Sequence, residues 1–113
     1  DTNILGVSLL TSIDDIDTRE LYNNDFKKQF DNLINLAMET EIDGIVCSSQ
    51  ELELIKDTSL IKVVPGIRNQ HTFDDQKRVM TSGEAYSKGA DYIVVGRPIT
   101  QAKDIEEAIK DYS

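Results

Sequence analysis

The residues with the clearest chemical potential lie where an apolar run ends, at Gly96–Arg97–Pro98. The preceding run, Tyr92–Val95, is rich in β-branched residues, which is typical of a buried strand. Glycine lets the backbone approach a ligand closely, and proline suits the first position of a helix. Helix starts favour anions, and the planar guanidinium of Arg97 matches phosphate oxygens. The pattern favours a phosphate site at the carboxyl end of a strand; an ordinary strand–helix junction with a surface arginine is the alternative.

A second arginine follows another apolar run in the same way. Leu60–Val64 reads as a strand, and Pro65–Gly66–Ile67–Arg68 ends it. Because parallel strands deliver their carboxyl ends to one edge of a sheet, we expect Arg68 and Arg97 to lie at the same edge. Two solvated loop arginines are the alternative. Gln76 lies between the two strands, and its amide can both donate and accept hydrogen bonds, which taken alone is a weak signal.

The remaining polar residues are weaker candidates for a functional site. Thr11 and Ser12 end the first apolar run, where their hydroxyls could meet a ligand or cap a turn. Three aspartates between positions 14 and 17 lack the glycine and distal glutamate of a calcium loop, so we interpret them as a solvated acidic loop and predict no metal site. His71 has no nucleophile at a recognisable spacing. Cys47 is interpreted as a small core residue.

The elements that must position these residues alternate four times between strand and helix patterns. This order predicts an α/β fold of four consecutive βα units with parallel strands, occupying residues 1–113 as a single partial domain. A complete eight-stranded barrel uses about 250 residues, so four units correspond to half of one; a small doubly wound domain is the alternative. The expected strands are Ile4–Leu10, Asp43–Cys47, Leu60–Val64 and Tyr92–Val95, and the expected helices are Asp25–Glu39, Ser49–Lys56, Val79–Lys88 and a last helix with Ala102, Ile105, Ala108, Ile109 and Tyr112 on one face.

The amino-acid composition limits the classes of partner that this chain is expected to bind. The chain has 12 basic and 21 acidic residues among 113, a net charge of −9, which disfavours nucleic acid and anionic membranes as partners. No apolar run approaches the roughly 18 residues of a membrane span, and the single cysteine fits a reducing, cytoplasmic setting. An acidic chain that binds phosphate must do so through a local site, which gives the two strand-end arginines more weight.

Three blocks of this sequence together resemble the carboxyl-terminal half of the orotidine 5′-phosphate decarboxylase family. They are Val64–Pro65–Gly66–Ile67–Arg68, the block from Asp75 through Gln76 to Thr81, and Gly89–Thr100 with its Gly96–Arg97–Pro98 centre. The resemblance extends back to Leu9–Ser12 and Asp43–Ser48, so it covers essentially the whole chain. It implies the carboxyl-terminal half of a (β/α)8 barrel that converts orotidine monophosphate to uridine monophosphate in pyrimidine biosynthesis, without a metal or organic cofactor.

The resemblance also implies roles for individual residues. Arg97 and the backbone of Gly96 would hold the substrate phosphate, and Gln76 would bridge the phosphate and the pyrimidine. Arg68 would belong to the loop that closes over the ligand. The other two implied contacts are Thr11 with the base and Pro65 with the pocket wall near the reacting ring.

The family's catalytic centre, an Asp-x-Lys-x-x-Asp motif on an earlier strand, does not occur in these 113 residues. We therefore expect no catalytic residue in this chain, inactivity on its own, and an amino-terminal half-barrel as the missing partner. Complete members of the family are homodimers. Two alternatives remain open: a non-catalytic phosphate-binding half-barrel or remnant, and a related phosphosugar-processing barrel enzyme. The Gln76 block and the Pro65–Arg68 block argue against the second.

Overall fold

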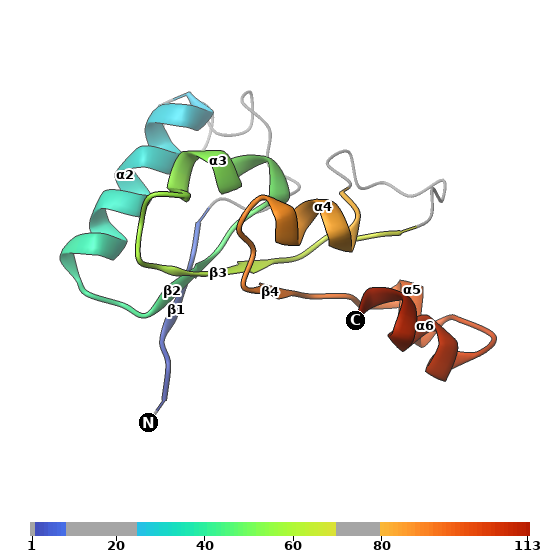
Figure 1. Cartoon of the computed structure of the whole chain (residues 1–113). Helices are drawn as coiled ribbons and strands as arrows, with labels where there is room; N and C mark the ends of the chain where they lie inside the picture. The colour runs from blue at the N-terminus through green and yellow to red at the C-terminus, as the bar shows by residue number, and fades with distance from the viewer. Residues whose placement is uncertain (1, 9–24, 70–79) are drawn as a thin grey trace.

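The computed structural model describes residues 2–8, 25–69 and 80–113, and they form one parallel sheet flanked by helices (Figure 1). The strands lie in the order β1-β2-β3-β4, each hydrogen-bonded to the next along the chain. Their bounds are β1 Leu5–Val7, β2 Gly44–Val46, β3 Ile61–Val64 and β4 Tyr92–Ile93. The predicted four-stranded parallel α/β arrangement is confirmed. Each strand lies inside its predicted range, which was one or two residues longer among the described positions. The predicted first strand also included positions 9 and 10, which lie outside the described residues.

The helices follow the strands as the alternation predicted. Asp25 caps the first described helix, since its side chain accepts a hydrogen bond from the Lys28 amide at 2.8 Å. The predicted helix over 49–56 is confirmed as a 3-10 turn followed by a short α-helix. The bounds are α2 Phe26–Glu39, η1 Ser49–Glu51, α3 Leu52–Ile55, α4 Ser82–Ser87, α5 Arg97–Thr100 and α6 Ile105–Tyr112.

The predicted start of α4 at Val79 is wrong. Met80 forms a parallel bridge with Ile67, and the helix begins only at Ser82. Thr81 is its N-cap, with a side chain that accepts from the Glu84 amide at 3.2 Å. Met80 is buried in the bridged segment before the helix, so its hydrophobicity does not indicate a helix. The predicted stop at Gly89 is confirmed, where φ is 104°.

The prediction of a single last helix is also wrong, because the chain forms two helices there, α5 and α6. Asp104 accepts a hydrogen bond from the Glu107 amide at 3.1 Å and so starts α6 as a separate helix after α5. The predicted apolar face holds only in part. Tyr112 is buried, whereas Ile105 and Ile109 are about half exposed in this structure.

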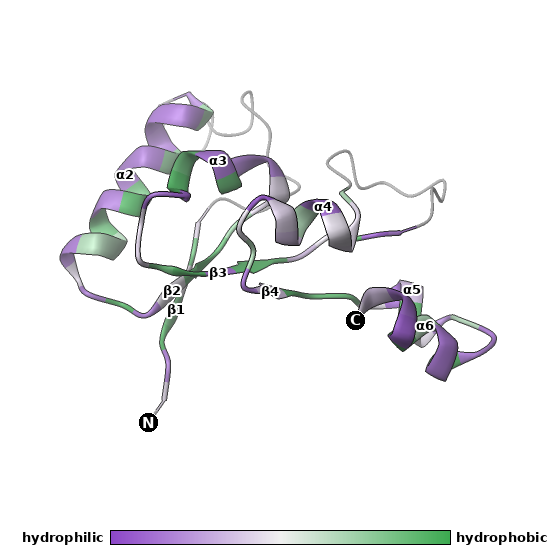
Figure 2. Ribbon diagram, in the orientation of Figure 1, coloured by the Kyte–Doolittle hydropathy of each residue, from purple (hydrophilic) through white to green (hydrophobic). Residues whose placement is uncertain are grey.

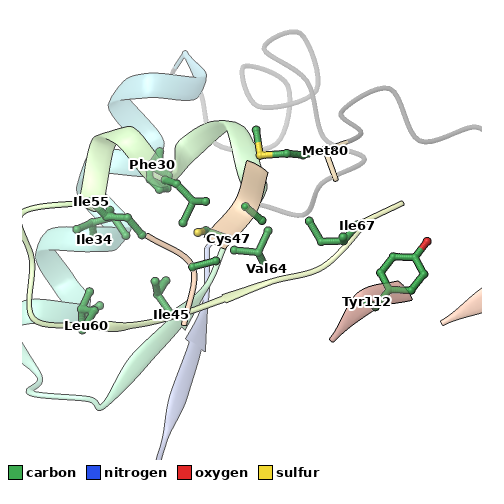
Figure 3. Close-up of a cluster of buried hydrophobic side chains, with 14 residues drawn as sticks. Phe30, Ile34, Ile45, Cys47, Ile55, Leu60, Val64, Ile67, Met80 and Tyr112 are labelled. Atoms are coloured by element: carbon green, nitrogen blue, oxygen red, sulfur yellow. The ribbon is translucent and has the colours of Figure 1, made fainter. Parts of the chain in front are cut away.

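The core lies between the sheet and the helices α2, α3 and α4, which all cover the same face (Figure 1). Phe30 and Ile34 from α2 meet Ile55 from α3 above the side chains of the strands (Figure 3). On the strands, Ile45 and Val64 point into this layer and are at most 2% exposed. Tyr112 of α6 lies at the far edge of the cluster, beyond Ile67 (Figure 3).

The opposite face of the sheet has no helix over it (Figure 1). Strand registers place Val7, Val46, Val63 and Tyr92 in one row across this face. The two outer members of the row, Val7 and Tyr92, are 60% and 62% exposed. The four strands therefore form a sheet that is packed on one side only.

Candidate functional site

The carboxyl ends of β3 and β4 leave the sheet side by side. The Val94 amide donates to the Val64 carbonyl at 2.9 Å, which continues the pairing of the two strands past the last residue of β4. Pro65 follows directly on one strand and Val95–Gly96 on the other. This pairing delivers the two predicted binding segments to one edge of the sheet.

Gly96 is the N-cap of α5, which begins at Arg97 and carries its proline in the first turn. The carbonyl of Gly96 accepts hydrogen bonds from the Ile99 and Thr100 amides at 2.9 and 3.0 Å. These are the first hydrogen bonds of the helix. A Cβ placed on Gly96 would meet no described atom within 4 Å. The space over this backbone is thus open, as a glycine that contacts a ligand requires.

Arg68 is held at the same edge by backbone contacts. Gly66 has a φ of 74°, a left-handed conformation that glycine adopts without steric cost and that turns the chain after Pro65. Beyond this turn, the Arg68 amide donates to the Met80 carbonyl at 3.0 Å. Pro65 itself is half-buried at the exit of β3.

Arg68 and Arg97 line one open cleft of about 980 Å³, whose other lining residues lie on α5, on α6 and between these two helices. Its other charged groups have both signs: Lys103 and Lys110 against Asp104, Glu107 and Asp111. The cleft thus brings the two strand-end arginines together. Sequence reasoning missed the contribution of α6, because it considered only the apolar face of that helix.

Asn69 is a second residue that sequence reasoning missed. Its side-chain oxygen accepts from the Ser82 amide at 2.8 Å, at the start of α4, and its amide nitrogen donates to the Asp111 carbonyl at 2.8 Å, near the end of α6. Its backbone N–H donates to the Tyr112 hydroxyl at 2.9 Å. Asn69 therefore ties the segment that carries Arg68 to two helices.

Thr11 and Gln76, the other two predicted binding residues, lie outside the described residues. So do the three aspartates near position 14 and His71. Within the described segments, no three histidine, cysteine, aspartate or glutamate side chains gather as a metal site would need.

Cys47 is 1% exposed in the core, at the end of β2. Burial raises the pKa of its thiol to about 12, the nearby Glu51 carboxylate adds to the increase, and Lys62 acts in the opposite direction. A thiol with this pKa stays protonated near neutral pH, so it cannot act as a nucleophile. Its interpretation as a core residue is confirmed.

Comparison with known proteins decides the family. The model of the "Orotidine 5'-phosphate decarboxylase / HUMPS family" matches residues 1–112. The chain belongs to this family. Three curated relatives are named orotidine 5'-phosphate decarboxylase: those of Actinobacillus succinogenes (40% identical), Glaesserella parasuis (44%) and Aquifex aeolicus (43%). The matches take in 95%, 89% and 95% of this chain but 48%, 46% and 51% of the relatives, so the chain spans about half their length.

Solved structures also match this chain over about half of their own length. The orotidine 5'-phosphate decarboxylase of Lactobacillus acidophilus matches with a TM-score of 0.75 at 29% identity, over 97% of this chain and 49% of that protein. An uncharacterized conserved protein of Geobacillus kaustophilus matches with a TM-score of 0.71 at 25% identity, over 98% and 49%. The predicted fold, half of a TIM barrel, is confirmed by these neighbours.

No helix in the described part of the chain is long and apolar enough to cross a membrane.

Proposed function

We propose that residues 1–113 are the carboxyl-terminal, substrate-binding half of an orotidine 5′-phosphate decarboxylase. The observation that carries the proposal is the cleft that both Arg68 and Arg97 line, with Arg97 directly after the open backbone of Gly96. Guanidinium forks and backbone N–H groups at a helix start are both suited to binding a phosphomonoester. The names of the curated relatives supply the substrate, orotidine monophosphate.

The proposed binding roles are those that the resemblance to the family implies. Arg97 and the Gly96 backbone hold the phosphate, and Gln76 bridges phosphate and pyrimidine. Arg68 closes over the ligand, Thr11 contacts the base, and Pro65 lines the wall near the reacting ring. Arg68 and Arg97 act locally, since a net charge of −9 gives the chain no general attraction for a phosphate ester.

Catalysis requires a second half. The Asp-x-Lys-x-x-Asp motif is absent from the sequence, and with it the lysine and aspartates that would supply the proton and the electrostatic stress. This chain alone is therefore inactive, and its partner is an amino-terminal half-barrel that carries those residues. The complete enzyme works as a cytoplasmic homodimer without metal or organic cofactor.

Two other functions compete with this one. The family description joins the decarboxylase with a second group, so membership alone does not exclude a phosphosugar-processing barrel. The shared name of the relatives at 40–44% identity favours the decarboxylase. A non-catalytic phosphate-binding half-barrel would share the cleft but would gain no activity from an amino-terminal half.

Titration of uridine monophosphate and of inorganic phosphate into the ¹⁵N-labelled chain tests the site. We expect weak binding, about millimolar or −4 kcal/mol, with NMR shifts centred on Gly96 and Gln76. Arg97→Ala should weaken it by about 1.5–3 kcal/mol, because it removes a charge-assisted contact. Lys88→Ala removes the same charge from the exposed end of α4 and should change little. Equal losses in the two variants, or shifts centred elsewhere, would refute the assignment.

A further inference from the structure

The helix α6 is joined to the segment that carries Arg68 through one buried side chain. Figure 2 shows α6 coloured mainly as hydrophilic, and Tyr112 is its buried residue, at 8% exposure. The ring of Tyr112 belongs to the same buried cluster as Ile67, the residue before Arg68 (Figure 3). Its hydroxyl accepts a hydrogen bond of 2.9 Å from the backbone N–H of Asn69, the residue after Arg68.

A second contact joins the same two segments. The side-chain amide of Asn69 donates to the backbone carbonyl of Asp111 at 2.8 Å. The Nε atom of Arg68 is buried, although the residue as a whole is half-buried. The hydrogen bonds at Asn69 and the burial of Nε both restrict where the Arg68 guanidinium can lie.

The contacts of α6 also lead to Arg97. α6 packs against α5, which begins at Arg97. The paired strands β3 and β4 connect Arg68 and Arg97 by one route, and the contacts from α5 through α6 to Asn69 connect them by another. The open cleft is lined by three members of this ring of contacts, namely Arg68, Arg97 and Tyr112.

We propose that Tyr112 and Asn69 are positioning residues for Arg68. They hold its guanidinium where it binds the same phosphate as Arg97, a role that rests on the proposed function. Without the Tyr112 hydroxyl, the backbone N–H of Asn69 has lost its acceptor, and the Arg68 segment is no longer bonded to that side chain. Binding must then supply the free energy that fixes Arg68, and this cost lowers the affinity.

Tyr112→Phe is the variant that tests the positioning, because it removes one oxygen atom and keeps the ring in the core. Titration of uridine monophosphate into the ¹⁵N-labelled chain, followed by NMR, should show affinity weakened by about three- to tenfold. Tyr86→Phe is the matched control, since it removes the same hydroxyl from a position on α4 that is 45% exposed. Asp25→Ala, which removes the cap of α2, controls for lost stability. Both controls should change the affinity by less than about twofold.

A double-mutant cycle separates positioning from a general structural effect. In the Arg68→Ala background, Tyr112→Phe should change the affinity for uridine monophosphate by less than about twofold, since the arginine that it positions is gone. Equal fold losses in the two backgrounds would show that Tyr112 does not act through Arg68. An unchanged affinity of Tyr112→Phe in the wild-type background would refute the positioning role as well.

A measurement without ligand distinguishes this role from the proposed function. The Nε–H resonance of Arg68 reports on the surroundings of a buried atom. Tyr112→Phe should shift this resonance and speed its exchange with water, and Tyr86→Phe should leave it in place. If the wild-type chain binds no uridine monophosphate but the resonance responds in this way, the phosphate site is refuted and the positioning of Arg68 stands. If the resonance is the same in both variants, the positioning is refuted, even where uridine monophosphate binds as expected.

Discussion

Replacing Asn69 with alanine removes the contact that joins the Arg68 segment to α4 and α6. The side-chain oxygen of Asn69 accepts from both the Ser82 amide, at 2.8 Å, and the Ser82 hydroxyl, at 3.1 Å. Its amide nitrogen donates to the carbonyl and carboxylate of Asp111, at 2.8 and 3.3 Å. The two ends of the contact differ in burial: Ser82 is buried and Asp111 is exposed.

This difference in burial determines how much stability the Asn69→Ala substitution costs. Water replaces Asn69 at the exposed Asp111, so those two hydrogen bonds contribute little to the cost. The Ser82 amide is a buried donor at the start of a helix, and its loss of a partner costs about 1–3 kcal/mol. The backbone bond from Asn69 to the Tyr112 hydroxyl survives the substitution. For a domain of this size we expect the melting temperature to fall by about 4–12 °C.

Urea and thermal unfolding followed by circular dichroism measure the loss. Asn32→Ala is the matched control, since Asn32 is exposed on α2 and alanine is the better helix former. It should leave stability within about 0.5 kcal/mol of the wild type. The reasoning fails if Asn69→Ala is as stable as the wild type, or if both substitutions cost the same.

Three further predictions concern other parts of the structure. Gly44→Ala should destabilise by about 1–3 kcal/mol, because its Cβ would lie 2.5 Å from the Ile61 carbonyl oxygen, whereas Gly83→Ala in α4, whose Cβ meets nothing within 4 Å, should stabilise slightly. Asp25→Ala should cost about 1 kcal/mol through loss of the α2 cap, with a proportionate fall in the urea midpoint. The pKa of Cys47 is raised from 9.0 to about 12, so the contribution of this thiol to the free energy of unfolding should be constant below pH 9 and fall between pH 9 and 12, as the unfolded thiol ionises first. Cys47→Ala should lack that part of the decline; an identical alkaline profile in both proteins would contradict the assigned cause.

The elements that sequence predicted well are those with local signals. The β-branched runs predicted the strands, and the spacing of apolar residues after Asp25 predicted α2 and its N-cap. The start of α4 was missed although a local signal exists, the Thr-x-x-Glu spacing of Thr81 and Glu84. The Thr81 hydroxyl accepts from the Glu84 amide at 3.2 Å and donates to the Glu84 carboxylate at 3.0 Å. Asp104 and Glu107 have the same spacing at the start of α6.

The cleft was predictable only in part. Two arginines at the ends of neighbouring parallel strands must share an edge, and this much follows from topology alone. The contribution of α6 depends on contacts between residues far apart in the chain, such as the 43 positions that separate Asn69 from Tyr112. No local pattern encodes such a contact, because it arises from how the last helix packs after the sheet has formed.

The most direct test of the account is decarboxylation of orotidine monophosphate by this chain with and without an amino-terminal half. That half would be taken from a curated relative that carries the Asp-x-Lys-x-x-Asp motif, and the two pieces would be refolded together. We expect no turnover from the 113-residue chain alone, turnover from the reconstituted pair, and a large loss when the pair contains Arg97→Ala. Turnover by the purified chain alone, with host enzyme excluded, would contradict the claim that it holds the binding half and lacks the catalytic one.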